Sequence, residues 1–288
     1  WWEFKVKEPA LRDYLIYTSA GEAANVKHWA SSDSRNYDIW ITNYSEIPNL
    51  NRPYADHYNE CKGSKIPNLF AVVKQHEDIF RKYKAVMVAD DDVIISPRPL
   101  SALFRVLEQQ DLWMLQPAFS HFGKISHKIT QRRLKTSLRY VNFVEITCPI
   151  FPTEKLLEFL NVYTPEMATI VGIDYWLPYF FGIDQERKYA ISDKYYCVNP
   201  REQFKRVTSR ALDSVSSTEE RKSAVAVTLK SLGIRNFNYQ EYSSIKRPIH
   251  EQLIAFPKFL LELAFQGCWN VASKIRQAVS TIQHWVIS

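Results

Sequence analysis

The sequence predicts a mixed α/β fold in which a mostly parallel sheet is flanked by helices and followed by a C-terminal helical extension. The first observation is an alternation of short apolar runs with helical patterns along the first two-thirds of the 288 residues. The second is a hydrophobic content of 46% with 24% charged residues, which is typical of a soluble globular protein. The third is that no window holds 18 uncharged apolar residues, so no membrane-spanning helix is expected.

The first four elements follow one another as strand, strand, helix and strand. DYLIYTS (13–19) and YDIWITNY (37–44) are rich in β-branched and aromatic residues, which predicts strands. Residues 66–83 have helical composition, and Pro67 is tolerated in the first turn of such a helix. KAVMVA (84–89) predicts another strand, and it ends at an acidic triplet.

The next elements continue the alternation of helices and strands. After Pro99, apolar residues at positions 100, 103, 104 and 107 mark one face of a helix. LWMLQP (112–117) and FVEITCPIF (143–151) predict strands, and KLLEFL (155–160) predicts a helix for which Thr153 is a suitable N-cap. This βαβ order indicates a parallel sheet covered by helices.

The character of the chain changes near Thr208. The polar segment 208–224 reads as a linker that leads into a helix, and Ser217 and Glu220 have the spacing of a capping box. From Glu251 the chain is rich in Leu, Phe, Ala, Ile and Trp, which predicts one or two amphipathic helices. We therefore expect a main domain over residues 1–207, with a linker and helical extension over 208–288.

Composition excludes several classes of function. The sequence has no GxGxxG, GxxxxGK[ST], GxSxG or HExxH motif, so the usual nucleotide loops, nucleophile elbow and zinc-protease helix are absent. A net charge of +6 suits an anionic ligand or surface, but no nucleic-acid recognition pattern accompanies it. No CxxC pair is present, and Cys148 and Cys197 lie in apolar runs, which indicates buried thiols and a reducing compartment. The chain begins WWEFKVKEP, without Met or a signal-peptide pattern, as expected of a trimmed chain or one module of a longer protein.

The strongest functional signal is the triplet Asp90, Asp91 and Asp92 in VMVADDDVIIS. In open α/β sheets, ligands bind beyond the carboxyl ends of the strands, where this triplet is expected. Carboxylates suit Mg²⁺ or Mn²⁺, which can bridge an Asp and the phosphates of a nucleotide-sugar. A second Asp can accept a hydrogen bond from a ribose hydroxyl. The alternative is an acidic turn that only faces solvent.

The triplet resembles the DxD motif of glycosyltransferases with the GT-A fold. An ordered series of segments extends the resemblance over about residues 13–200, toward a poorly characterised family of plant and bacterial glycosyltransferase-like proteins: RNYDIWITNY, KGSKIPNLF, YKAVMVADDDVIIS, RYVNFVEITCPIF and VGIDYW. The resemblance implies a GT-A-like, Rossmann-like catalytic domain, a nucleotide-sugar donor, with UDP expected, and a glycan or lipid-linked acceptor.

The resemblance also assigns roles to individual residues. Asp92 corresponds to the metal-binding Asp, and Asp90 to the residue that contacts the ribose or the metal. The residues implied to bind the nucleotide-sugar are Thr18, Ser19, Gly21, Asp38, Lys62, Lys65, Asn68, Asp90 and Asp91. The alternatives are solvated surface charge for the lysines and a simple turn for Gly63.

One departure from the pattern concerns the metal. Many GT-A enzymes place a His after the last core strand as a further ligand, but YYCVNPRE has Asn199 near that place. A carbonyl oxygen of Asn199 can ligate Mn²⁺ or Mg²⁺ only weakly. The departure from the family pattern therefore bears on both the affinity for the metal and the activity.

A second carboxylate lies in VGIDYWLPYFFG. Inverting transfer needs a base that takes the proton of the acceptor hydroxyl, and Asp174 stands among aromatic residues that would raise its pKa. Trp176 could stack on a sugar ring. Asp174 could instead be a helix N-cap, and Glu145 is the second candidate for the base or for a contact with substrate hydroxyls.

The run from His121 to Tyr140 holds six lysines and arginines and no acid. A charge run of this kind is usually a solvated loop. Because it lies between two predicted core strands, it could also be a flap that meets a diphosphate or an anionic acceptor.

Two other functions fit parts of the sequence. VMVADDDVI nearly meets the haloacid-dehalogenase phosphatase motif, although that motif normally ends the first strand. Asn199 also allows a non-catalytic sugar-binding module. The C-terminal segment could pack on the core or lie on a membrane surface. We expect a cytoplasmic protein, peripheral to a membrane in the second case, or one in the Golgi lumen if the source is eukaryotic.

Overall fold

The computed structural model describes residues 12–164, 172–183, 185–201 and 237–287, with isolated positions between 223 and 233. Side chains of the last helix are described to residue 273. Ser217 and Glu220 of the expected linker therefore lie outside the described residues.

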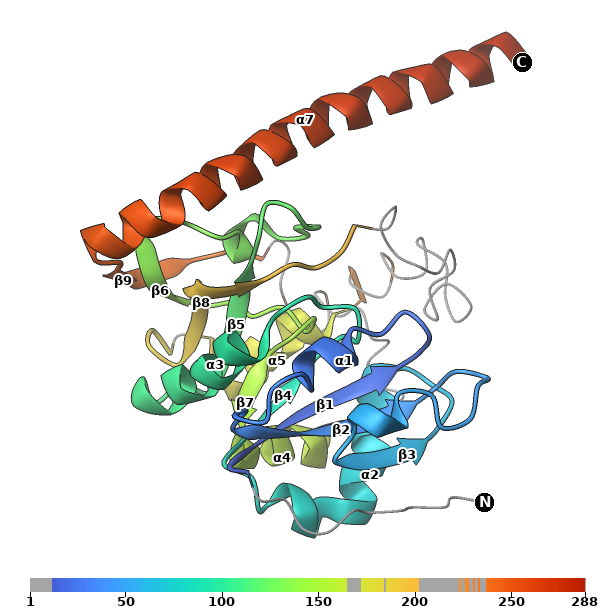
Figure 1. Ribbon diagram of the computed structural model, residues 1–288, viewed down its shortest axis with the longest axis vertical. Coiled ribbons are helices and arrows are strands. Elements are labelled where there is room, and N and C mark those ends of the chain that lie inside the picture. Colours follow the sequence, from blue (N-terminus) through green and yellow to red (C-terminus); the bar gives the residue numbers. More distant parts are fainter. Residues whose placement is uncertain are drawn as a thin grey trace.

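One mixed sheet runs through the described part of the chain in the order β3-β2-β1-β4-β7-β5-β8-β6-β9 (Figure 1). Its strands are β1 (Tyr14–Ala20), β2 (Tyr37–Asn43), β3 (His57–Glu60), β4 (Ala85–Val88), β5 (Met114–Phe119), β6 (Thr136–Val141), β7 (Ile150–Pro152), β8 (Tyr189–Cys197) and β9 (Glu241–Lys246). Strands β3, β2, β1 and β4 are parallel neighbours, as are β5 and β8. Only β7 and β6 run against the others, so the predicted mostly parallel sheet is confirmed.

Helices cover both faces of this sheet. They are α1 (Val26–Trp29), α2 (Lys65–Phe80), α3 (Pro97–Gln109), α4 (Thr153–Val162), α5 (Ile173–Phe181) and α7 (Ile249–Ile287), with short 3-10 turns η1 (Arg52–Tyr54) and η2 (Lys128–Thr130). Helices α1 and α3 pack on one face, and α2, α4 and α5 pack on the other. Because both faces are covered, the central strands are apolar throughout rather than alternating, as parallel strands are expected to be.

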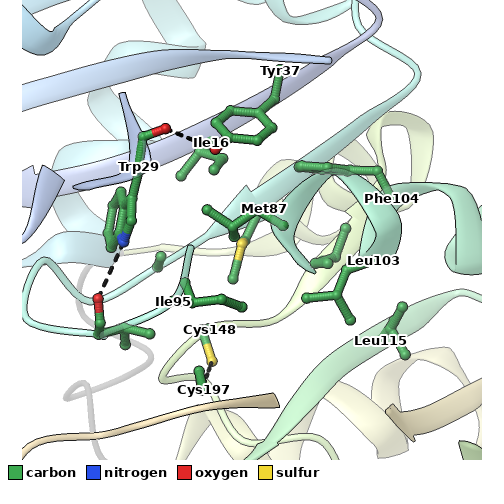
Figure 2. Packing of buried hydrophobic residues seen from close by; sticks show 14 of the residues in the cluster. Ile16, Trp29, Tyr37, Met87, Ile95, Leu103, Phe104, Leu115, Cys148 and Cys197 are labelled. Atoms are coloured by element: carbon green, nitrogen blue, oxygen red, sulfur yellow. Dashed lines mark hydrogen bonds between the residues drawn. The ribbon is translucent and has the colours of Figure 1, made fainter. Parts of the chain in front are cut away.

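The core on the α1 and α3 side joins side chains from most of the sheet (Figure 2). The indole of Trp29 donates to the Val93 carbonyl at 3.2 Å, and the Tyr37 hydroxyl donates to the Trp29 carbonyl at 2.8 Å, so α1 is fixed to its neighbours. Cys148 and Cys197 are free, buried thiols whose sulfur atoms lie 4.0 Å apart. The predicted burial of these two thiols is confirmed.

The elements expected before residue 120 are present within a few residues of their predicted bounds. The strand expected over 143–151 is wrong for most of its length, because only its end belongs to β7 and residues 142–149 are irregular. Thr153 is not an N-cap, since its hydroxyl donates to the Tyr83 carbonyl at 2.6 Å instead of to α4. Strands β3, β6 and β9 were not predicted.

The C-terminal part consists of β9 followed by one long helix, α7, that crosses the sheet edge and continues past the body (Figure 1). The expected helical extension is therefore present as one helix. Strand β9 pairs with β6, so the sheet takes its last strand from the segment assigned to the extension. The division at residues 207 and 208 stays a prediction. Among the described residues, no helix is both long and apolar enough to cross a membrane.

Candidate active site

The acidic triplet follows β4 at the edge where the parallel strands end. The Gly21 N–H after β1 donates to Asp91 Oδ2 at 2.8 Å, and the Tyr44 hydroxyl after β2 lies 3.5 Å from the same oxygen. The main chain of the triplet also accepts hydrogen bonds from Asn25. Asp91 therefore holds three strand-end loops together, which is a structural reason for one carboxylate of the triplet.

Lys65, the first residue of α2, lies under the triplet with only 9% of its side chain exposed. Its ammonium group is 2.6 Å from Asp90 Oδ1 and donates to the carbonyls of Ile146 at 2.6 Å and Thr147 at 3.3 Å. An ammonium group has three donors, and all three are occupied here. Lys65 thus joins the triplet to the irregular segment 142–149 rather than presenting an unpaired charge to a ligand.

Two further carboxyl groups are near Lys65: Glu145 belongs to that segment, and Asp174 contacts it. The Ile146 N–H donates to Asp174 Oδ1, and the Ile146 carbonyl accepts from Lys65, so the main chain of one residue contacts both side chains. Glu145 is 6% exposed, and its Oε1 accepts from the Thr147 hydroxyl at 2.9 Å, while Oε2 is buried without a hydrogen-bond partner. Lys65 and Ile146 therefore connect Asp90 to Asp174, and the charges of these two carboxyls act on Glu145.

Burial and mutual repulsion move the pKa values of two of these carboxyls toward neutrality. Burial, followed by the charges of Asp174 and Asp90, raises the pKa of Glu145 to about 8. Burial raises the pKa of Asp174 to about 6, although the Ile146 N–H and the Lys65 charge oppose the shift. Perturbed carboxyls of this kind are typical of functional sites, and a base works best when its pKa is near the working pH.

The first-strand loop and the segment before α2 meet beside the triplet. Asn68 donates to the Ser19 hydroxyl at 3.2 Å and to the carbonyls of Cys61 and Gly63. Gly63 has φ +136, and a Cβ there would lie 2.8 Å from the Asn68 side chain, so the turn requires glycine. Thr18 is fully buried in β1 and donates to the Ser19 carbonyl.

Two predicted binding residues are not brought to this place. Asp38 lies near the start of β2, at the other end of the strand from Tyr44, where Arg12 and the Tyr83 hydroxyl bond its carboxylate. Lys62 is turned to the surface, where it contacts Glu46 at 2.6 Å and two main-chain carbonyls. Their predicted contacts with a nucleotide-sugar have no support from this arrangement, and neither enters the site proposed below.

Asn199 does lie beside the triplet. Ile94, two residues after Asp92, forms an antiparallel bridge with Val198, with a hydrogen bond of 2.9 Å in each direction. Asn199 follows Val198 and is therefore close to the triplet. The Asn199 carbonyl accepts from the Lys124 N–H at 2.7 Å. Its main-chain oxygen is therefore already used in the fold.

The carboxylates of the triplet could hold a divalent metal ion only if phosphate groups of a bound substrate supplied most of the other ligands. In the described part of the chain, no three His, Cys, Asp or Glu side chains are grouped closely enough to hold a metal ion. Mg²⁺ commonly takes one or two carboxylates and completes its shell with phosphates and water. Partly exposed Asp92 and Asp90 can supply that number of carboxylates.

Two arginines of the basic run from His121 to Tyr140 are buried in ion pairs instead of facing solvent. Arg132 and Arg139 are buried, and their partners are Glu262 at 2.5 Å and Asp193 at 2.8 Å, so the solvated reading is wrong for both. Lys124 differs, since its charge acts on the Glu145 carboxyl. One cation of the run thus lies near the carboxyl group.

An aromatic cluster includes Tyr175, the residue that follows Asp174. Buried Phe143 contacts rings of four neighbours, namely His127, Tyr175, Phe237 and Tyr239. The Tyr239 hydroxyl lies 2.7 Å from His127 Nδ1 and 3.0 Å from the Tyr175 hydroxyl. Desolvation and, to a lesser degree, the charges of Asp174 and Glu145 raise the pKa of Tyr175 and of Tyr239, which shows how close this cluster is to the carboxyls.

The sequence pointed to a different ring. Trp176 stacks on Phe180 with centroids 4.9 Å apart and also contacts Phe159, so it anchors α5 to the core. Sequence reasoning missed Tyr239, because it comes more than 60 residues after Tyr175 and has no motif around it. Likewise, Asp174 is not the predicted N-cap, since Gly172 holds that position and Asp174 lies in the first turn.

Comparisons with known proteins address the fold. No protein-family model matches the chain, and no curated protein matches its sequence significantly. Among solved structures, S. aureus TarS 1-349 in complex with UDP-GlcNAc matches at 14% identity over 78% of this chain and 68% of that chain, with a TM-score of 0.51. The mannosyltransferase PcManGT from Pyrobaculum calidifontis, in complex with GDP-Man and Mn²⁺, matches at 11% identity over 100% and 84%, with a TM-score of 0.49.

The chain spans less than half of the longer TarS structure, 43%, at 13% identity and a TM-score of 0.48. At such identities a structural match speaks for the fold and not for the reaction. The TM-score for the UDP-GlcNAc complex establishes that this chain and TarS 1-349 share one fold.

Proposed function

We propose that this protein is a metal-assisted glycosyltransferase that moves a sugar from a nucleotide-sugar donor to a hydroxyl of a glycan or lipid-linked acceptor, with inversion. The observation that carries the proposal is the connection of Asp90 to Asp174 through Lys65 and Ile146, at the carboxyl edge of a parallel sheet. The charges of both carboxyls act on Glu145. Ligands of open α/β sheets bind at this edge. The TarS complex with UDP-GlcNAc, which shares the fold, supports UDP as the nucleotide.

The donor would lie over the triplet, between the loops that follow β1 and β4. Gly21 and Ser19 belong to the first loop, and Asn68 braces it from α2. Asp91 organises the loops, while Asp90 and Asp92 would hold Mn²⁺ or Mg²⁺, with Asn199 beside them. Such an ion offsets the negative charge that develops on the departing diphosphate.

Asp174 is the proposed base. With a pKa of about 6 it is mostly ionised at neutral pH, yet basic enough to take a proton from an attacking hydroxyl. The hydrogen bond from the Ile146 N–H fixes one oxygen, which leaves the other for the acceptor. Glu145, with a pKa of about 8, is protonated at neutral pH and can donate from its unpaired Oε2 to a substrate hydroxyl.

The aromatic cluster is the proposed acceptor surface. Rings of Tyr175, Tyr239 and His127 can stack on a sugar face, and their linked polar atoms can bond its hydroxyls. Free buried thiols at Cys148 and Cys197 support a reducing, cytoplasmic compartment for this enzyme. The proposed family, a plant and bacterial glycosyltransferase-like group, stays a prediction.

The test is a screen of UDP- and GDP-sugars, with and without Mn²⁺, by thermal shift, followed by radiolabelled transfer to a panel of aryl glycosides and lipid extracts. We expect Mn²⁺-dependent stabilisation by a UDP-sugar and transfer with inversion. Hydrolysis of a generic phosphomonoester, lost in Asp90→Asn, would replace the proposal with the phosphatase alternative. Nucleotide binding without turnover on any acceptor would favour the non-catalytic module.

A further inference from the structure

The outward side of α7 is an apolar surface on a helix that a soluble protein would be expected to cover with polar residues. Ile254 is 80% exposed, Leu253 is 69% exposed and Leu261 is 64% exposed. The other large apolar side chains exposed on the described part of this helix are Ile249, Phe256, Leu260, Leu263 and Val271. Leu253, Leu260 and Val271 are spaced by seven and eleven residues and so share one face. We name the eight exposed residues the outer face of α7.

The inward side of α7 meets the body through aromatic rings, as in the contacts of Phe259 with His121 and of Phe265 with Phe122, and through polar side chains. Glu262 is fully buried and its Oε1 lies 2.5 Å from Arg132. Gln266 Oε1 contacts His121 Nδ1 at 2.5 Å, and Glu251 contacts Lys194 at 2.8 Å. The helix therefore turns its carboxylates toward the protein and its leucines toward the outside, which is the reverse of an ordinary surface helix.

The distribution of acidic and basic residues along this helix favours an anionic partner. Glu251 and Glu262 are the only acidic residues between positions 249 and 288, and both are paired with cations of the body. The sequence of the helix adds Lys258, Lys274 and Arg276 to the same segment. No carboxylate remains for the outer face, so an anionic surface can approach it without repulsion.

We propose that the outer face of α7 lies on an anionic lipid surface, with the helix parallel to the membrane plane. An apolar face without acids, on a helix whose sequence also holds Lys258, Lys274 and Arg276, is the composition of an interfacial helix. An apolar patch of this extent marks an interaction site. Among the described residues, no helix is fit to span the bilayer. The axis of α7 runs past the body in Figure 1, so its outer face can reach a flat surface along much of its length.

This inference rests on the surface and does not depend on the proposed reaction. If both hold, the membrane brings the site to a lipid-linked acceptor. Loss of vesicle binding and loss of sugar transfer to a soluble acceptor are measured separately, so the failure of one proposal does not imply the failure of the other.

The experiment is flotation of the full chain with vesicles of phosphatidylcholine alone or with about one-third phosphatidylglycerol. The test variant combines Leu253→Gln, Leu260→Gln and Leu261→Gln. The control variant combines Ile47→Gln and Val162→Gln, two residues of the body with exposures of 47% and 41%. Since each leucine contributes about tenfold when it enters lipid, we expect the test variant to bind at least about a hundredfold more weakly and the control to bind like the parent.

Three results would overturn the proposal. The first is a parent that floats with neither vesicle, and the second is equal flotation of the test and control variants. A parent that forms a dimer without vesicles, which the test variant converts to a monomer, would assign the outer face to a second copy of the chain if neither form floats. Because the changed residues are exposed, equal thermal midpoints for all variants show that the comparison is between folded proteins. Binding to anionic vesicles should also weaken as salt rises to about 0.5 M, and salt-independent binding would contradict the role of charge.

Discussion

The ammonium group of Lys65 lies 2.6 Å from Asp90 and bonds the carbonyls of Ile146 and Thr147 at the same time. Two segments far apart in the sequence, 90–92 and 145–147, therefore share one cation. The Ile146 peptide continues the connection to Asp174. The distance between the carboxyl groups of Asp90 and Asp174 is thus fixed by the Lys65 side chain and the main chain of Ile146.

Replacement of Lys65 tests this connection. Lys65→Met would leave Asp90 and two largely buried carbonyls without their donor, so we expect a loss of about 2–4 kcal/mol in the free energy of unfolding. Lys62→Met is the matched control, because Lys62 is 59% exposed and pairs with Glu46 at the surface. The control should change stability by less than about 0.5 kcal/mol. Urea unfolding of both variants makes the comparison, and equal losses would contradict the connecting role of Lys65.

The metal is tested at Asp92. Asp92→Ala should abolish the stabilisation that Mn²⁺ adds to UDP binding, since a partly exposed residue at a strand end can be changed without loss of the fold. Asp33→Ala, on an exposed turn after α1, is the control and should keep that stabilisation. Thermal shift with UDP, with and without Mn²⁺, measures the effect. If Asp92→Ala responds to Mn²⁺ and UDP as the parent does, the ion is held elsewhere.

The base is tested at Asp174. Asp174→Asn keeps an oxygen for the Ile146 N–H but cannot take a proton, so transfer should fall by about 10²–10⁴-fold while donor binding stays. In the parent, kcat/KM should decline below pH 6, because the base must be ionised and its pKa is about 6. Glu154→Gln, in the first turn of α4 and exposed, is the control. A product with retained anomeric configuration would remove the need for this base.

Glu145 gives a prediction about stability and pH. Its pKa is raised from 4.5 to about 8 in the folded protein, so the native state holds a proton that the unfolded chain releases above pH 4.5. The stability that this group contributes is therefore complete below pH 4.5 and is lost as pH rises toward 8. Relative to Glu145→Gln, the parent should lose roughly 2–4 kcal/mol between pH 5 and pH 8. Urea unfolding across this range measures the difference, and parallel curves for parent and variant would contradict the shift.

Much of the fold could be predicted from the sequence, because local patterns decide it. The apolar runs of β1, β2 and β4 and the periodic face of α3 carry their own signals. Strand β6 escaped prediction because it follows a run of lysines and arginines and itself contains Arg139, which is buried against Asp193. The charge of Arg139 is neutralised by Asp193, 54 residues later in the chain, and this pairing cannot be recognised in the sequence.

The acidic residues of the candidate site could be predicted from the sequence, but the contacts that connect them could not. A triplet of Asp after an apolar strand is visible in the sequence, and Asp174 stands in a short motif. The link through Lys65 and Ile146 depends on an irregular loop that was predicted as a strand. Lys62 and Lys65 look equivalent in KGSKIPNLF, yet the turn at Gly63 sends one to the surface and the other into the site.

The last prediction concerns how α7 is attached to the body. Arg132 and Glu262 are 2% and 0% exposed in their side chains, and their ion pair is 2.5 Å long. Arg132 also lies over the Tyr196 ring at 3.7 Å. Removal of one partner leaves a buried charge without compensation, so Arg132→Met or Glu262→Met should each cost about 3–5 kcal/mol.

The double variant decides whether the cost comes from the pair or from the isolated charge. Arg132→Met with Glu262→Met removes both charges and fills the space with apolar atoms, so it should recover most of the lost stability. Lys194→Met is the control on the same helix interface, because Lys194 and Glu251 are 39% and 28% exposed, and a screened pair of this kind should cost less than about 1 kcal/mol. Urea unfolding of the four variants gives the coupling. If the double variant loses as much as the sum of the single ones, Arg132 and Glu262 act independently, and α7 is held by its ring contacts with Phe122 and Arg201 instead.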